Sequence, residues 1–250
     1  MKRFEDLVVL VTGAASGIGK ASALRIADEG GAIACVDLDL PGARATAEEI
    51  EKAGGQALAL GCDVSDPGAV RETVERAVER FGGLDALCNI AGILRFDNLL
   101  DLSPEDFDRV LAVNLRGTFL MCQAALPHLI ETRGSIVNMS STAALGAHAW
   151  TAAYSASKGG VLALTKCIAV EFGRRGVNCN AVCPASVETP MSTGVRLPEG
   201  ADLTLLKKIE PFDGIVRPPS DVAGVVAFLA SRDAVHVNGD QIRADGGVLT

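Results

Sequence analysis

The stretch Thr12-Gly13-Ala14-Ala15-Ser16-Gly17-Ile18-Gly19 follows a short apolar run, Leu7–Val11, and precedes an amphipathic stretch, Lys20–Glu29. This order predicts a strand, a glycine-rich turn and a helix. Glycine allows a tight turn and close backbone approach to a ligand, and a helix N-terminus offers free N–H groups. The spacing G-x3-G-x-G differs from the usual dinucleotide pattern, and glycines alone also suit a plain turn. Their position at the first strand–helix junction favours a site for dinucleotide phosphates.

The remaining chain repeats this alternation of apolar and amphipathic stretches. Further strands are expected at Ala32–Val36, Gln56–Cys62, Leu84–Ile90, Gly134–Ser140, Val177–Cys183 and Asp240–Arg243. Further helices are expected at Ala43–Lys52, Pro67–Phe81, Ser103 to about Ile130, Thr151–Phe172 and Asp221–Ala230, with a partly helical insertion at Pro198–Glu210. The alternation predicts one doubly wound (Rossmann) α/β domain over residues 1–250, with about seven parallel strands and helices on both faces.

Composition limits the function classes. The net charge is −8 and the basic residues are scattered, which argues against a nucleic-acid partner. No apolar run approaches the ~20 residues of a membrane span, so no membrane partner is expected. The seven cysteines are an odd number without C-x-x-C, which favours a reducing, cytoplasmic compartment. Cys179 and Cys183 have no accompanying histidine or carboxylate cluster, so no metal site is expected.

Asp37 follows the second expected strand. An acid there can accept hydrogen bonds from an adenosine ribose and repels a 2′-phosphate. Leu38 comes next and Ser16 lies in the loop, so neither supplies a cation, although Arg44 is within conceivable reach. NAD is therefore expected rather than NADP; the alternative is a plain turn residue.

Asp63 and Val64 follow the third expected strand at the same edge of the sheet. The Asp63 carboxylate could accept a hydrogen bond from the adenine amino group. The alternative is a helix N-terminal role, with Ser65 or Asp66 as the cap ahead of Pro67.

Tyr154 and Lys158 lie four residues apart on an expected helix, which places both side chains on one face. A free tyrosine has a pKa of about 10, too high for an efficient base at neutral pH. A nearby ammonium favours the phenolate and lowers that pKa. The pair therefore predicts proton transfer, although this spacing alone is common on surface helices.

Other polar residues support this interpretation. Ser141 follows the fifth expected strand, and Asn114 lies within the long helical region. Together with Thr12–Gly19, Asn89–Gly92, Tyr154 and Lys158, they resemble the short-chain dehydrogenase/reductase family in its form of about 250 residues. The resemblance runs from Leu7 to about Pro190 and resumes at Asp245-Gly246-Gly247.

The resemblance implies a role for each residue. Tyr154 would be the general acid/base, Lys158 its partner, Ser141 the group that holds and polarises the substrate oxygen, and Asn114 the holder of a water that joins Lys158 to solvent. It also implies a homotetramer (or homodimer), with the long helices and the C-terminal segment at its interfaces. The residues expected to bind NAD are Gly13, Ser16, Gly17, Ile18, Gly19, Asp37, Leu38, Asp63, Val64, Asn89, Ala91, Gly92, Tyr154, Lys158, Pro184, Val187 and Thr189.

The sequence departs from the family's pattern at two positions. Ile90 stands where the family usually has a second Asn, and Ala185 stands where it typically has Gly. The first change removes a structural amide, and the second could alter the backbone's approach to the nicotinamide.

The expected reaction is interconversion of a secondary alcohol and a ketone. The expected pocket walls are mostly apolar, which favours a neutral, fairly hydrophobic small-molecule substrate. They comprise Ile93, Leu94, Thr142, Ala143, His148, Trp150, Ser186 and a covering segment at about 190–212. One alternative is 3-oxoacyl-thioester reduction, which usually uses NADPH and is disfavoured by Asp37. Another is a non-catalytic dinucleotide sensor or scaffold, disfavoured by Ser141, Tyr154 and Lys158. A P-loop hydrolase is excluded because G-x4-G-K-[ST] is missing.

Overall fold

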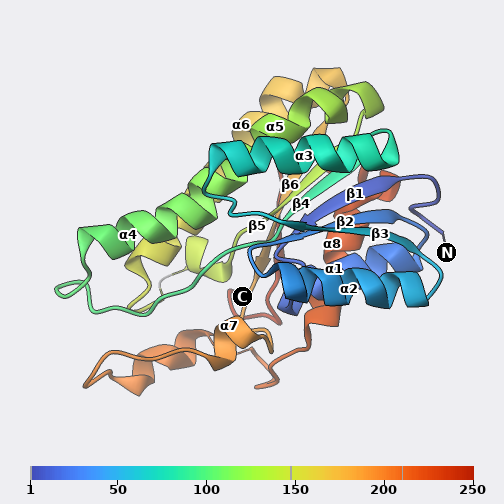
Figure 1. Cartoon of the computed structure of the whole chain (residues 1–250). Coiled ribbons are helices and arrows are strands. Elements are labelled where there is room, and N and C mark those ends of the chain that lie inside the picture. The colour runs from blue at the N-terminus through green and yellow to red at the C-terminus, as the bar shows by residue number, and fades with distance from the viewer. Residues whose placement is uncertain (1, 147, 210) are drawn as a thin grey trace.

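The computed structural model describes residues 2–146, 148–209 and 211–250, so Glu210 of the expected insertion lies outside the described residues. Its centre is a parallel sheet in the order β3-β2-β1-β4-β5-β6-β7 (Figure 1). The strands are β1 (Val8–Thr12), β2 (Ala32–Asp37), β3 (Gln56–Gly61), β4 (Ala86–Asn89), β5 (Ser135–Met139), β6 (Asn178–Pro184) and β7 (Gln241–Ala244). The expected doubly wound sheet is confirmed, with strand boundaries shifted by at most two residues.

Helices cover both faces of the sheet (Figure 1). The α-helices are α1 (Gly17–Asp28), α2 (Leu40–Lys52), α3 (Pro67–Phe81), α4 (Pro104–Leu111), α5 (Gly117–Thr132), α6 (Ala152–Phe172), α7 (Pro190–Thr193) and α8 (Pro219–Ala230). Short 3-10 turns are η2 (Thr142–Ala144), η3 (Gly173–Arg175), η4 (Leu203–Ile209) and η5 (Arg232–Ala234), and η1 (Ala112–Arg116) is a π turn. The expected partly helical insertion at Pro198–Glu210 contains η4 over its described residues, and α7 precedes it.

Two apolar layers hold the helices to the sheet. One packs α1, α2 and α8 against one face, with Ile26, Ile33 and Val226 fully buried. The other packs α3, α5 and α6 against the opposite face, around residues such as Leu10 and Leu129. Burial of each large aliphatic side chain contributes roughly 1.5–3 kcal/mol. Because both faces are covered, the central strands are rich in buried apolar residues, as is typical of parallel sheets.

Local signals explain where the helices begin. Ser103 accepts a hydrogen bond from the N–H of Asp106 at 3.1 Å, and Pro104 occupies the first turn, so the expected start signal is confirmed. Asp66 accepts from the N–H groups of Gly68 and Ala69 and caps α3. The cap of α3 is therefore Asp66, which leaves Asp63 for another role.

The helix expected from Ser103 to about Ile130 is continuous from Pro104 to Thr132, through the π turn. By length and composition alone it could cross a membrane, contrary to the sequence expectation. However, 44% of its most apolar window is buried, and Met121 and Leu129 are in the core. These contacts are those of a core helix.

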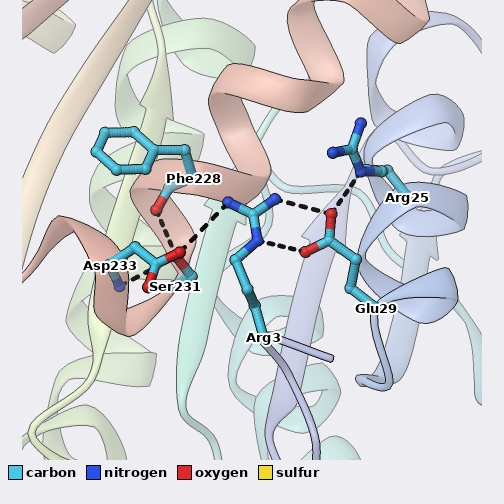
Figure 2. A network of polar contacts seen from close by, with 6 residues as sticks. All are labelled: Arg3, Arg25, Glu29, Phe228, Ser231 and Asp233. Carbon is cyan, nitrogen blue, oxygen red and sulfur yellow. Dashed lines mark hydrogen bonds and ion pairs between the residues drawn. The ribbon is translucent and has the colours of Figure 1, made fainter. Parts of the chain in front are cut away.

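An ion-pair network joins the N-terminal segment to the ends of α1 and α8, far from the carboxyl ends of the strands (Figure 2). Arg3 makes two contacts with Glu29, at 2.5 and 2.7 Å, and Arg25 makes a third at 2.5 Å. Arg3 also lies 3.8 Å from Asp233, beyond the end of α8. Glu29 is only 8% exposed, and the guanidinium groups hold the pKa of its carboxyl below the usual range.

Candidate active site

A cavity of about 830 Å³ opens at the carboxyl ends of the strands. It lies at the point where the strand order reverses, between β1 and β4, which is the usual ligand position in such sheets. Of the residues expected to bind NAD, all but Asn89 line it. Of the four expected catalytic residues, Ser141, Tyr154 and Lys158 line it, and Asn114 lies buried behind the wall.

The glycine loop is shaped for close backbone approach. Gly13 and Gly17 have φ angles of +72° and +53°, which residues with a Cβ rarely adopt. A Cβ at Gly19 would lie 2.0 Å from the carbonyl oxygen of Gly13. Because both the conformation and the space exclude larger residues, the loop forms a backbone cradle at the start of α1. This cradle suits the phosphates of a dinucleotide.

The Thr12 hydroxyl links the cradle to the neighbouring strand end. It accepts hydrogen bonds from the N–H groups of Ile90 at 2.9 Å and Ala91 at 3.1 Å. Thr12 is 2% exposed, so these N–H groups could not easily find water instead. The hydroxyl therefore fixes the distance between the β1 loop and the β4 loop across the switch point.

Asp37 lines the cavity and is already part of the loop structure. One carboxylate oxygen accepts from the N–H of Ala15 and the other from the N–H of Asp39, each at 2.9 Å. Each oxygen retains a lone pair for a ribose hydroxyl. The turn role and the ligand role are therefore compatible. Arg44, the one expected nearby cation, is exposed on α2 and does not line the cavity.

Asp63 also lines the cavity, and its carboxylate accepts from the N–H and hydroxyl of Ser65, at 2.9 and 2.7 Å. This turn orients the carboxylate without using all of its acceptor capacity. Thr189 also lines the cavity and caps α7. A Cβ at Gly17 would lie only 3.2 Å from the Thr189 methyl group. The covering segment thus begins directly against the glycine loop.

Asn89 serves the core and not the cavity wall. Its amide donates to Asn138 at 2.9 Å and to the sulfur of Cys122 at 3.3 Å. Its own carbonyl oxygen is buried without a hydrogen-bond partner among the described residues. Ile90, at the position of the family's second amide, lines the cavity. The departure therefore makes this part of the wall apolar.

Lys158 is almost completely buried, with 3% exposure, and its ammonium donates to the carbonyl oxygen of Met139 at 2.8 Å. Burial lowers the pKa of Lys158 to about 8. The ammonium lies 5.6 Å from the centre of the Tyr154 ring, within cation–π range. The helix spacing therefore brings the expected pair together.

Burial raises the pKa of Tyr154, although a hydrogen bond with Ser141 acts in the opposite direction. The expectation that Lys158 lowers this pKa is wrong for the protein alone. The physical reason is that desolvation of the phenolate dominates, while the ammonium is directed at Met139. Phenolate formation therefore needs further positive charge, which an oxidised nicotinamide would supply.

Asn114 lies at the centre of the π turn, fully buried. Its side chain accepts from the N–H of Ile93 at 2.8 Å and donates to the carbonyl of Ile93 at 2.9 Å and to Ser157 at 3.1 Å. Single π turns occur often at functional sites. The side chain thus ties the β4 loop to the long helix and α6. The side-chain amide of Asn114 therefore forms its hydrogen bonds with other residues of the chain.

The substrate end of the cavity is mostly apolar, as expected. Residues from the expected walls and covering segment that line it are Ile93, Leu94, Thr142, His148, Ser186, Pro190, Met191, Ser192, Val195, Leu197, Leu206 and Ile209. Ala143 and Trp150 are not among the lining residues. The cavity is also lined by Phe96, Arg109, Ala112 and Val113, which were not predicted from the sequence. The i, i+3, i+4 spacing of the last three was the signal for one helix face.

Metal chemistry has no visible basis here. Within residues 2–146, 148–209 and 211–250, no group of three or more His, Cys, Asp or Glu side chains could hold a metal ion. All seven cysteines are free thiols, and only Cys167 is exposed. The site's chemistry therefore rests on hydroxyl, phenol, amine and backbone groups.

Comparison with known proteins gives the family. A family model described as enoyl-(acyl carrier protein) reductase matches residues 13–249. A 3-oxoacyl-[acyl-carrier-protein] reductase, FabG, of Thermotoga maritima is 40% identical, over 99% of each chain. The chain belongs to the short-chain dehydrogenase/reductase family. A further member, the D-threitol dehydrogenase of Mycolicibacterium smegmatis, is 42% identical, over 98% of this chain and 94% of that protein.

Solved structures of short-chain dehydrogenases/reductases have the same fold. The crystal structure of a short chain dehydrogenase from Mycobacterium paratuberculosis, bound to NAD, superposes with a TM-score of 0.89. It is 32% identical, and the match covers 98% of each chain. The protein is accordingly an oxidoreductase of this family that acts on CH–OH groups. The glycine cradle described above fits the dinucleotide of such an enzyme.

Proposed function

We propose that the protein is an NAD-dependent enzyme that interconverts a secondary alcohol and a ketone, with Tyr154 as general acid/base. One observation carries this proposal. The cavity that begins at the glycine loop and Asp37 ends at Ser141, Tyr154 and Lys158. A dinucleotide held by the loop would therefore extend toward the groups that can move a proton. The bound nicotinamide supplies the hydride acceptor or donor.

Each side chain at this end has a defined task. In oxidation the Tyr154 phenolate oxygen takes the hydroxyl proton of the alcohol as the C–H hydride leaves, and in reduction the phenol returns that proton. The Ser141 oxygen accepts from the N–H of Ala143 at 3.1 Å. Its own proton can be donated to the Tyr154 oxygen or to a substrate oxygen, where it stabilises developing negative charge. Lys158 holds a positive charge behind the phenol and could donate to a ribose hydroxyl.

NAD is proposed over NADP because Asp37 lines the adenosine end of the cavity. The carboxylate would repel a 2′-phosphate and accept from ribose hydroxyls. Leu38, which also lines the cavity, is 75% exposed and carries no charge. Among the described residues, the lysine and arginine side chains that line the cavity are those of Arg109 and Lys158. Neither residue is near Asp37 in the sequence.

Replacement of Tyr154 by Phe tests the proposal. We expect turnover to fall by at least about 100-fold, because general acid/base catalysis contributes about that much, whereas NADH binding persists. Turnover would be followed by NADH absorbance and binding by NADH fluorescence. Turnover within tenfold of the parent contradicts the role of Tyr154. Persistent NADH binding by a parent protein without turnover of any alcohol or ketone favours a sensor.

Reduction of a 3-oxoacyl thioester is a second candidate, because the Thermotoga maritima relative is named for this reaction. Comparison of acetoacetyl-CoA reduction by NADH and NADPH distinguishes the two. The first proposal expects NADH to be preferred and small hydroxy compounds to be oxidised. A preference for NADPH with the thioester supports the second.

A homotetramer or homodimer is part of the proposal. The outer faces of α5 and α6 carry exposed apolar residues, with Phe119 42% and Val170 84% exposed. Exposed apolar residues on helix surfaces favour an interface between copies of the chain. Light scattering after size exclusion should give two or four times the chain mass, and Val170→Glu should lower it. A monomeric parent contradicts this assignment.

We also propose a cytoplasmic location. Seven free cysteines, six of them buried, are typical of a reducing compartment. Fractionation of the source cells with an antibody to the protein tests this, and recovery in a secreted or membrane fraction contradicts it.

A further inference from the structure

His148 lies in the loop between η2 and α6 and lines the cavity. The Nε2 atom of its ring lies 3.4 Å from the hydroxyl of Thr142. Its carbonyl oxygen accepts from the hydroxyl of Thr151 at 3.0 Å. Both threonines are buried, with 0% and 2% exposure. A loop side chain held at its ring and at its backbone by two buried hydroxyls has a defined orientation.

The backbone beyond His148 is held in an unusual conformation. Trp150 has a φ angle of +62°, in the left-handed region that residues with a Cβ seldom adopt. The Trp150 carbonyl accepts from the N–H of Asp97 at 2.8 Å, so the loop is joined to the β4–α4 segment. Strain of this kind costs about 1–3 kcal/mol and persists where surrounding contacts enforce it. The loop is therefore built to one shape beside the cavity.

The imidazole has hydrogen-bonding capacity that the described protein contacts do not use. Burial lowers the pKa of His148, which favours the neutral ring. A neutral ring has one nitrogen donor and one nitrogen acceptor. Nε2 faces Thr142, and Nδ1 has no hydrogen-bond partner among the residues that the structure describes. One ring nitrogen can therefore bind a molecule in the cavity.

In the proposed function the reacting oxygen lies at Ser141, which lines the same cavity as Thr142 and His148. Ser141, which would polarise that oxygen, is followed directly by Thr142, and successive Cα atoms are about 3.8 Å apart. The Thr142 hydroxyl holds the ring, so the polar groups of the wall form a short row. A row of this length matches two oxygens on neighbouring or next-nearest carbons. The walls beyond it, such as Ile93 and Met191, are apolar.

We propose that His148 is a specificity-determining residue whose ring nitrogen hydrogen-bonds a second substrate oxygen, one or two carbons from the reacting carbon. This inference rests on the proposed function and narrows its substrate class to diols and hydroxy-ketones. A simple alcohol would bury the ring nitrogen without a hydrogen-bond partner, which weakens its binding in the reactive position. Sites that hydrogen-bond a substrate group reject analogues without it far better than apolar sites reject size changes.

Matched substrate pairs test the inference. The rate constant kcat/KM is measured for 2,3-butanediol against 2-butanol and for 1,2-cyclohexanediol against cyclohexanol, each with NAD. The parent should prefer the diol of at least one pair by roughly tenfold or more, the effect of one unpaired polar group. His148→Leu should abolish this preference. His148→Asn, which has nearly the shape of Leu but retains polar atoms near the Nδ1 position, should restore most of it.

His236, exposed beyond η5, supplies the matched control. His236→Leu should keep the parent's preference. Equal or better use of the mono-alcohol in both pairs by the parent overturns the inference, as does a preference that survives in His148→Leu. The inference is also overturned if the parent oxidises none of the four compounds. Loss of hydride transfer in Tyr154→Phe is a separate readout, so the proposed function can hold while the role of His148 fails.

Discussion

The ammonium of Lys158 donates to the carbonyl oxygen of Met139 at 2.8 Å, so the last residue of β5 is tied to the middle of α6. This bond holds a buried cation behind the Tyr154 ring. Because burial lowers the pKa of Lys158 from 10.5 to about 8, the folded protein binds this proton less tightly than the unfolded chain does. The positive charge therefore lowers the stability of the free protein.

Replacement of Lys158 by Met should separate activity from stability. Turnover should fall by at least about 100-fold, while the melting temperature without added dinucleotide should rise at neutral pH. The unfolding free energy should increase by about 1–3 kcal/mol, because the buried charge is removed. In the parent, the buried charge of Lys158 lowers the unfolding free energy by its full amount below pH 8. This destabilisation disappears as pH rises from 8 to 10.5, since the unfolded state binds more protons over that range. The gap between variant and parent should therefore narrow over that range. A variant that melts below the parent at neutral pH contradicts the prediction.

Tyr154 is the only tyrosine, so its ionisation can be followed directly by ultraviolet absorbance. Burial should hold its pKa above 10 in the free protein. Ser141→Ala removes the hydrogen bond that acts against burial, so it should raise this pKa further. Ser220→Ala, on α8 and away from the cavity, is the control and should leave the titration unchanged. A pKa below 10 in the free parent argues against dominant desolvation.

Asp37→Asn should weaken the choice of NAD over NADP. The neutral amide removes the repulsion of a 2′-phosphate but still has an oxygen that can accept from the N–H of Ala15. The ratio of kcat/KM for NAD to that for NADP should fall by roughly tenfold or more. Asp39→Asn removes a charge two residues away and retains a good cap for α2, so it should keep the parent's ratio. Equal ratios in the parent and Asp37→Asn would mean that another group selects the cofactor.

Arg3→Met should destabilise the fold without reaching the active site. It leaves Glu29 with Arg25 alone, and loss of one partner of a buried charged hydrogen bond costs about 1–3 kcal/mol. The melting temperature should fall by about 2–4 °C for each kcal/mol. Since Arg3 keeps the pKa of Glu29 low, its stabilising effect is present above the unfolded pKa of the carboxyl. The effect is lost as pH falls through the lower folded value, so parent and variant should converge in acid. Thermal melts from neutral pH downward measure this, and a constant gap contradicts it.

Sequence patterns predicted the sheet because a parallel strand covered on both faces is mostly an apolar run, as Val8–Val11 of β1 is. The glycine loop and Asp37 could also be located, since each follows a strand at the ligand edge. Local spacing could not show which atoms a side chain contacts. The direction of the Tyr154 pKa shift was missed because it depends on burial, and Lys158 is bound to a carbonyl from another element.

Long-range packing also explains the contacts that the sequence could not show. Thr12 was placed at the start of the glycine loop, but its contacts with Ile90 and Ala91 require β4 to lie beside β1. His148 was expected to line the pocket, but its two threonine contacts appear only when the loop folds back. The π turn around Asn114 could not be predicted, because its change in hydrogen bonding over five residues has no signature in residue type.

That π turn makes the long helix sensitive to insertion or deletion of residues. Each added or deleted residue rotates the part of the helix before it by about 100° relative to the part after it. Deletion of one residue in Ala112–Arg116 would restore regular helical hydrogen bonds, yet it would turn Arg109 and Phe107 away from their present neighbours. Divergence in this helix should therefore proceed by exchange of side chains, with insertions and deletions confined to the loop before Pro104.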